Sequence, residues 1–219
     1  MHQKRIAKLI KKCSLMGLFC LLFTLSSWAC ANPLILVLGD SLSAEYGLPR
    51  GSGWVKLLDQ ELHKQGSDWT VFNASISGET SAGGLTRLPA LLKLKTPDVI
   101  LLELGANDAL RGLTIEQTKD NLRKIIRLSK QSGAKVLLFG MQIPPNYGQQ
   151  YTKQFKDLYS TLASQEGIQL LPFFLEGVAQ NKDLFQADNI HPNVAAQSIL
   201  FKNVWGAMAP YQTILIPKK

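Results

Sequence analysis

Five short apolar segments, separated by longer amphipathic stretches, constrain the fold of this chain more than any other feature. These segments, rich in Val, Ile, Leu and Phe, are residues 34–38, 70–73, 98–104, 134–139 and 168–171. Strands that are apolar almost without interruption are typical of a parallel sheet covered by helices on both faces. The sequence therefore predicts a single α/β domain, a three-layer α/β/α sandwich with a five-stranded parallel sheet.

The stretches between these segments have helical patterns. Residues 52–64 place Trp54 and other apolar side chains on one face and polar side chains on the other. The segment from Thr114 opens with "TIEQ", which matches a capping box at a helix start. A last helix is expected to begin at Pro192 and to turn inward the side chains of Phe201, Val204, Trp205 and Met208.

The first 31 residues differ from the rest of the chain. A basic start is followed by an apolar run over residues 14–25 and then by Ala29 and Ala31 in an A-x-A arrangement. This is the layout of a secretory signal peptide, and the apolar run is shorter than the roughly 20 residues of a membrane span. A retained anchor and a lipidated Cys30 are weaker alternatives. We predict that residues 1–31 direct export and are removed, and that residues 32–219 form one periplasmic or secreted domain.

Removal of this segment changes the charge and the cysteine content. The whole chain has 24 basic and 16 acidic residues and a formal net charge of +8. Five of the basic residues and none of the acidic ones precede residue 32, and the remainder has no basic cluster that would indicate nucleic-acid binding. Because Cys13, Cys20 and Cys30 all lie in the segment, the mature chain is expected to lack disulfides and cysteine metal sites.

Polar residues follow four of the five predicted strands. After the first, second, third and fifth strands come, in turn, Asp40 with Ser41, Gly78, Asn107, and Asp188 with His191. Ligands of open parallel sheets bind outside the carboxyl ends of the strands, so these residues are expected to meet there. Each alone has an ordinary structural interpretation, such as a helix cap for the Asp-Ser pair or a turn for the glycine.

The histidines make the functional interpretation more specific. Beyond residue 31 the chain has two, and His63 lies on the polar face of an amphipathic helix, where a solvated role is expected. Asp188 precedes His191 by three residues, so its carboxylate can fix the tautomer of the ring, and the other ring nitrogen can then serve a hydroxyl. We predict Ser41 as a nucleophile, His191 as its base and Asp188 as the residue that orients the base.

Attack of a serine on a carbonyl requires donors for the oxyanion that forms. The predicted donors are the backbone N–H groups of Ser41 and Gly78 and the side-chain amide of Asn107. Asp40 is expected to be structural and to bind loop amides. The glycine-rich runs lack the ending of a phosphate loop, and with no thiol and one spare histidine we expect no metal site.

These residues resemble the SGNH, or GDSL, hydrolase family. The matching blocks are "GDSLS" with Ser41, "NASISGETS" with Gly78, "GAND" with Asn107, and "DNIHPN" with Asp188 and His191. The resemblance covers nearly all of the chain after residue 31 and is greatest to bacterial periplasmic esterases. It implies a flavodoxin-like sheet of order 2-1-3-4-5 and an acyl-serine mechanism without a cofactor. It also implies broad action on thioesters, lysophospholipids and short aryl esters. We expect the protein to be a monomer. In "SAEYGLPRGSGW", Glu45 and Arg50 depart from the pattern and are expected to add charge near the mouth of the site.

An acyl chain needs an apolar groove beside Ser41. The loops after the third and fourth strands are the candidates, and the predicted substrate-binding residues are Leu110, Ile143, Pro144 and Tyr147. The same residues could instead pack the end of the sheet. Two other functions stay open, a carbohydrate O-deacetylase of the same fold and a non-catalytic lipid-binding module. A deacetylase would be favoured by aromatic residues that stack on a sugar, and the sequence has no cluster of them near the motifs. A lipid-binding module would not need a serine, a histidine and an aspartate together.

Overall fold

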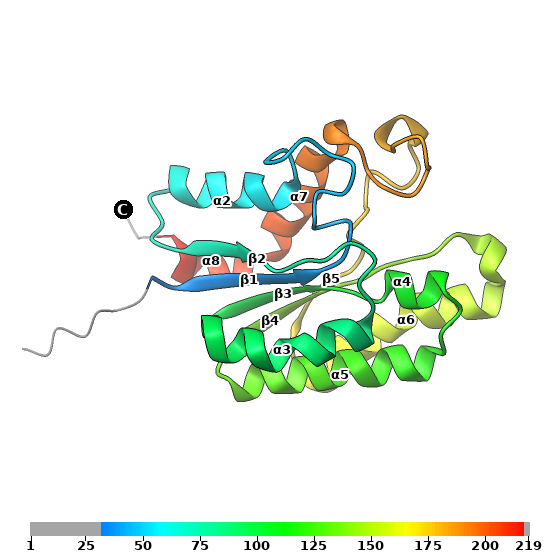
Figure 1. The fold of residues 1–219 in the computed structure, drawn as a ribbon, viewed down its shortest axis with the longest axis horizontal. Coiled ribbons are helices and arrows are strands. Elements are labelled where there is room, and N and C mark those ends of the chain that lie inside the picture. The colour runs from blue at the N-terminus through cyan, green and yellow to red at the C-terminus, as the bar shows by residue number, and fades with distance from the viewer. Residues whose placement is uncertain (1–31, 217–219) are drawn as a thin grey trace, which may run out of the picture. The chain divides into compact units, whose positions relative to one another are not determined.

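The computed structural model describes residues 32–216 (Figure 1). The predicted signal peptide, with its three cysteines, lies outside the described residues. Strands β1 (Leu34–Gly39), β2 (Thr70–Asn73), β3 (Val99–Glu103), β4 (Lys135–Phe139) and β5 (Gln169–Leu171) form one parallel sheet. The strand order is β2-β1-β3-β4-β5, which confirms the predicted fold class and topology.

Helices cover both faces of this sheet. They are α2 (Trp54–Lys64), α3 (Ser81–Lys95), α4 (Ala106–Leu110), α5 (Ile115–Gln131), α6 (Gln149–Glu166), α7 (Gln197–Ala207) and α8 (Ala209–Leu215). Helices α2 and α7 lie on one face, and α3, α5 and α6 lie on the other (Figure 1). Strand β3 is therefore buried along its whole length, which explains its nearly unbroken apolar sequence. Within residues 32–216, no helix is both long enough and apolar enough to cross a membrane.

The helix predicted over residues 52–64 is present as α2, which begins at Trp54, and the predicted start of α5 is confirmed. Trp54, at the start of α2, is fully buried, and its indole N–H donates to the carbonyl of Leu42 at 3.2 Å. The hydroxyl of Thr114 caps α5 by accepting the N–H of Gln117 at 3.2 Å. Trp54 thus connects the core directly to the loop that follows β1.

The predicted start of the last helix is wrong by five residues. Pro192 pairs with Phe185 in an antiparallel bridge, which holds the chain extended there. Asn193 then caps a single 3₁₀ turn over Val194–Ala196, and α7 begins only at Gln197. Four side chains were expected to turn inward. Val204 and Met208 are fully buried, whereas Phe201 and Trp205 are only partly buried.

Candidate active site

Strand β1 ends in a tight turn that carries Ser41. The carbonyl of Asp40 accepts the N–H of Ser43 at 3.2 Å and that of Ala44 at 2.9 Å, so the chain reverses directly after the strand. The bond from Trp54 to Leu42 fixes the same turn from the helical side. The serine hydroxyl is therefore held at the carboxyl edge of the sheet, where the sequence predicted it.

The hydroxyl of Ser41 lies at one end of a hydrogen-bonded chain of three side chains. Its Oγ is 2.9 Å from Nε2 of His191, and Nδ1 of His191 is 2.6 Å from Oδ2 of Asp188. Because a carboxylate only accepts hydrogen bonds, Nδ1 carries the ring proton and Nε2 is left to accept from the serine. This arrangement makes the serine more nucleophilic by providing a base for its proton.

Backbone groups hold Asp188 in place. Its Oδ1 accepts the N–H of Ile190 at 2.9 Å and that of His191 at 3.0 Å. The backbone N–H of His191 is the main cause that lowers the pKa of the Asp188 carboxyl to about 2, with a further contribution from the imidazole. The group is therefore ionised at neutral pH and keeps the ring of His191 oriented.

Of the three predicted oxyanion donors, Ser41 and Asn107 line the same cavity, whereas Gly78 is not among the residues that line it. The N–H groups of Ser41 and Gly78 donate no hydrogen bond within residues 32–216, so both are available to a ligand. Gly78 has a φ of +77°, a conformation that a residue with a side chain rarely adopts. Arg111 donates from Nη2 to the carbonyl of Gly78 at 2.8 Å and so ties this loop to the end of α4.

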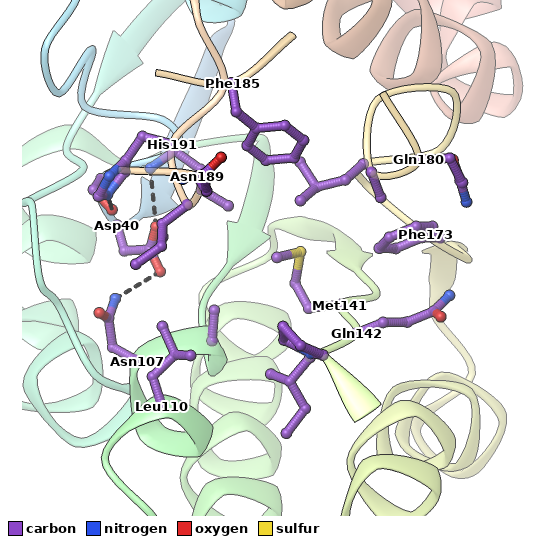
Figure 2. Close-up of a pocket in the computed structure, with 18 of the residues that line it drawn as sticks. Asp40, Asn107, Leu110, Met141, Gln142, Phe173, Gln180, Phe185, Asn189 and His191 are labelled. Carbon is purple, nitrogen blue, oxygen red and sulfur yellow. Dashed lines mark hydrogen bonds between the residues drawn. The ribbon is translucent and has the colours of Figure 1, made fainter. Parts of the chain in front are cut away.

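The third donor, the amide of Asn107, has two partners inside the protein. Its Nδ2 lies 2.8 Å from Oδ2 of Asp40 (Figure 2). It also lies 3.0 Å from the carbonyl oxygen of Glu79. Both neighbours are acceptors, which fixes the orientation of the amide and engages both of its hydrogens. An oxyanion must therefore share or replace one of these bonds.

Asp40 belongs to a buried pair of acidic residues that was not predicted from the sequence. Its Oδ1 accepts the N–H of Leu42 at 3.0 Å, and burial raises the pKa of its carboxyl to about 6. The second acid, Glu103, is the last residue of β3 and is fully buried. Its Oε2 accepts the N–H of Asp40 at 3.2 Å and the hydroxyl of Ser43 at 2.8 Å, while its Oε1 has no partner.

Burial raises the pKa of Glu103 well above its ordinary value, and the charge of Asp40 adds to this effect. The strand pairing places Gly39 of β1 beside Glu103 of β3. A Cβ at Gly39 would lie 2.8 Å from Oε2 of Glu103, so the close approach of the acid requires a glycine here. An acid near the end of an apolar segment was the sequence signal for this feature.

A cavity of about 760 Å³ opens beside the serine (Figure 2). Three of the four predicted substrate-binding residues line it, namely Leu110, Ile143 and Pro144. Tyr147 does not line it and is 40% exposed at the end of a 3₁₀ turn. A further part of the wall comes from a segment the prediction left out, the one that follows β5, through Phe173, Leu175, Ala179 and Phe185.

Glu45 and Arg50, expected to add charge near the mouth of the site, are not among the residues that line the cavity. The carboxylate of Glu45 accepts the N–H of Gly51 at 2.9 Å and that of Gly53 at 2.8 Å, directly before helix α2. An acid in this position is stabilised by the unpaired N–H groups and the dipole of the helix start. The carboxylate of Glu45 therefore binds backbone amides of its own loop.

Comparisons with known proteins agree with this geometry. The model of the GDSL-like Lipase/Acylhydrolase family matches residues 37–199. The chain is 49% identical over 191 residues to esterase TesA of Pseudomonas aeruginosa, a match that covers 87% of this chain and 95% of that protein. It is 44% identical over 182 residues to thioesterase 1/protease 1/lysophospholipase L1 of Escherichia coli K12, covering 83% and 86%. The crystal structure of the psychrotrophic esterase EstA from Pseudoalteromonas sp., inhibited by monoethylphosphonate, matches with a TM-score of 0.79 and 40% identity, covering 84% of this chain and 100% of that chain.

Proposed function

The chain belongs to the GDSL-like lipase/acylhydrolase family and is a serine esterase, and on this premise we propose that Ser41, His191 and Asp188 are its catalytic triad. The observation that supports this assignment most strongly is the pair of contacts made by His191, 2.9 Å to Ser41 and 2.6 Å to Asp188. A nucleophile, a base and an orienting carboxylate within hydrogen-bond reach are the elements of an activated serine.

The reaction proceeds in two acyl transfers. Nε2 of His191 takes the proton of Ser41 as Oγ attacks the carbonyl carbon, and the carbonyl oxygen becomes an oxyanion. The N–H groups of Ser41 and Gly78 and the amide of Asn107 donate to that oxyanion. His191 then gives its proton to the departing alcohol or thiol, leaving an acyl-serine. Water, activated by the same histidine, hydrolyses the acyl-serine in the second transfer and regenerates Ser41.

The substrates we propose are small carboxylic esters and thioesters with an apolar acyl chain. The cavity beside Ser41 is about 760 Å³ and is lined mainly by apolar side chains, among them Leu110 and Ile143. Such a cavity suits an acyl chain, with the ester carbon next to Ser41. The relatives named esterase and thioesterase 1/lysophospholipase L1 support extending this range to acyl-CoA, aryl esters and lysophospholipid. Tyr147 is placed outside this acyl site.

We further propose that residues 1–31 are a cleaved signal peptide and that residues 32–219 act as a monomer in the periplasm or outside the cell. The basic, apolar and A-x-A parts of the N-terminal sequence support export. N-terminal sequencing of exported protein should find Asn32 or a neighbouring residue first. Finding Met1 on exported protein would contradict the cleavage.

The proposed function is tested with p-nitrophenyl esters from acetyl to palmitoyl, using the wild type and the Ser41→Ala variant. Turnover by the wild type should exceed that of the variant by about 10⁴-fold or more, as expected for the loss of a nucleophile. The optimum should lie above acetyl because the cavity accommodates a longer chain. Equal turnover by two folded proteins would refute the serine mechanism, and a strict acetyl preference would refute the acyl-chain site.

A further inference from the structure

A tyrosine covers one face of the proposed catalytic histidine. The ring centroids of Tyr46 and His191 are 4.4 Å apart, and the two planes are tilted by 39°. Tyr46 is 49% exposed, so one side of its ring contacts His191 while much of the side chain faces solvent. Among the described residues, His191 lines the acyl cavity whereas Tyr46 does not. The tyrosine therefore lies behind the histidine and outside the space for the acyl chain.

The backbone that presents this tyrosine is held in an unfavourable conformation. Glu45 has a φ of +58°, which is uncommon for a residue with a side chain. The two hydrogen bonds from Gly51 and Gly53 to its carboxylate keep it there. Strained residues persist where the surrounding structure fixes them, and they gather at functional sites. Here the strain and its anchors direct the next side chain, Tyr46, over the imidazole.

A second connection joins the tyrosine to the loop that carries the histidine. Nε2 of Gln186 donates to the carbonyl of Tyr46 at 2.8 Å and to that of Pro192 at 3.2 Å. The backbone N–H of Gln186 also donates to the carbonyl of His191 at 2.8 Å. Gly47, with a φ of +68°, packs so closely that a Cβ there would overlap the side chain of Gln186. The positions of the two rings are therefore fixed relative to each other.

We propose that Tyr46 is a positioning residue that holds the imidazole of His191 in the orientation needed to protonate the leaving group. This inference rests on the proposed function. The aromatic face limits rotation of the imidazole and shields one side of it from water. It also lies against the ring that becomes a cation between the two proton transfers, an arrangement that aromatic faces stabilise. The phenol hydroxyl has no part in this role, so phenylalanine should replace tyrosine.

The Tyr46→Leu and Tyr46→Phe variants test this proposal with two butyrate esters, p-nitrophenyl butyrate and ethyl butyrate. Nitrophenolate departs without a proton, whereas ethoxide depends on protonation by His191. In Tyr46→Leu we expect kcat/KM to fall by about tenfold for the nitrophenyl ester and by about 100-fold for the ethyl ester, within the range of general acid–base effects. Tyr46→Phe should retain most of the activity on both. Because the tyrosine lies outside the acyl cavity, nitrophenyl octanoate should show the same loss as nitrophenyl butyrate.

Other outcomes would overturn the proposal in distinguishable ways. A larger loss on the nitrophenyl ester, or a loss confined to KM, would make Tyr46 a surface that binds the leaving group. Equal losses in the leucine and phenylalanine variants would assign the effect to the hydroxyl. If Ser41→Ala is inactive while Tyr46→Leu matches the wild type, the proposed function stands and this inference fails. If Ser41→Ala is as active as the wild type, the proposed function itself fails. Leu94→Ala, at an exposed position on helix α3, is the matched surface control.

Discussion

The Asp40→Asn variant tests the link between the buried acids and the oxyanion donors. Asp40 accepts the N–H of Leu42 through Oδ1 at 3.0 Å and the amide of Asn107 through Oδ2 at 2.8 Å. Asparagine has the same shape but a single acceptor oxygen, so its NH₂ group must face one of these two donors. The N–H of Leu42 is part of the turn that carries Ser41. We therefore expect the oxygen to stay with Leu42 and the amide of Asn107 to lose its partner.

The size of the effect follows from the number of bonds that remain. Complete loss of one oxyanion donor costs about 10² to 10³ in kcat. The amide of Asn107 keeps its bond to the carbonyl of Glu79 at 3.0 Å, so one of its two anchors survives. We expect kcat to fall by about 10- to 100-fold, less than for full donor loss. An unpaired buried donor costs about 1–3 kcal/mol of stability, partly offset because the substitution removes a buried charge at pH 7.

The assay is a double-mutant cycle on kcat with Asp40→Asn, Asn107→Ala and the double variant, with thermal unfolding as the control for folding. If Asp40 acts through Asn107, the double variant should be no slower than Asn107→Ala alone. Losses that multiply in the double variant would show that Asp40 acts by another route. Wild-type kcat in folded Asp40→Asn would refute the reasoning altogether.

Four further predictions follow from the same geometry. Glu103→Gln should keep kcat within about twofold, because an amide oxygen can still accept both donors of Oε2. Because burial raises the pKa of Glu103, ionisation of this group lowers the stability of the wild type. The melting temperature of the variant should therefore rise relative to that of the wild type as pH increases. A difference in melting temperature that is constant with pH would contradict this. Gly105→Ala should destabilise by about 1–3 kcal/mol or more in urea unfolding, since φ is +111° and a Cβ would lie 2.5 Å from the hydroxyl of Tyr159; an unchanged midpoint would refute it. The folded pKa of Asp188, about 2, lies below its ordinary 3.8. The ionised Asp188 should therefore stabilise the wild type relative to Asp188→Asn fully above about pH 4, and this difference should disappear as pH falls toward 2. Melting temperatures of the two proteins that differ equally at every pH would exclude this effect. Leu110→Ala should shift acyl-chain preference while short esters turn over normally, and an unchanged chain-length profile would remove Leu110 from the acyl site.

The fold and the central site residues were predictable because they depend on local patterns and one topological rule. Each apolar segment was continuous enough to identify a strand, although the edge strands β2 and β5 are only partly buried, and the carboxyl ends of parallel strands share one edge. That rule is sufficient to bring Ser41, Asn107 and His191 together from distant parts of the sequence. No long-range contact had to be known in advance.

The features that were missed depend on contacts with no periodic signature. The start of α7 is delayed because Pro192 pairs with Phe185, and the spacing of side chains does not encode such a bridge. The cavity wall from residues 173–185 lies largely outside helices and strands, so hydrophobic periodicity could not identify it. Glu103 was visible as an acid in an apolar segment, but its bonds to the Ser41 turn depend on the register between β1 and β3.

The two internal hydrogen bonds of Asn107 affect how the enzyme distinguishes a bound ester from the transition state of its reaction. A neutral ester carbonyl is an acceptor comparable to the peptide carbonyl of Glu79, so it gains little by competing with it for the amide. A negatively charged tetrahedral oxygen is a much stronger acceptor and attracts the donor away from that partner. In the proposed mechanism the contribution of Asn107 is thus withheld until charge develops, and it favours the transition state over the bound ester. By this reasoning Asn107 contributes to the rate of the chemical step far more than to the affinity for substrate.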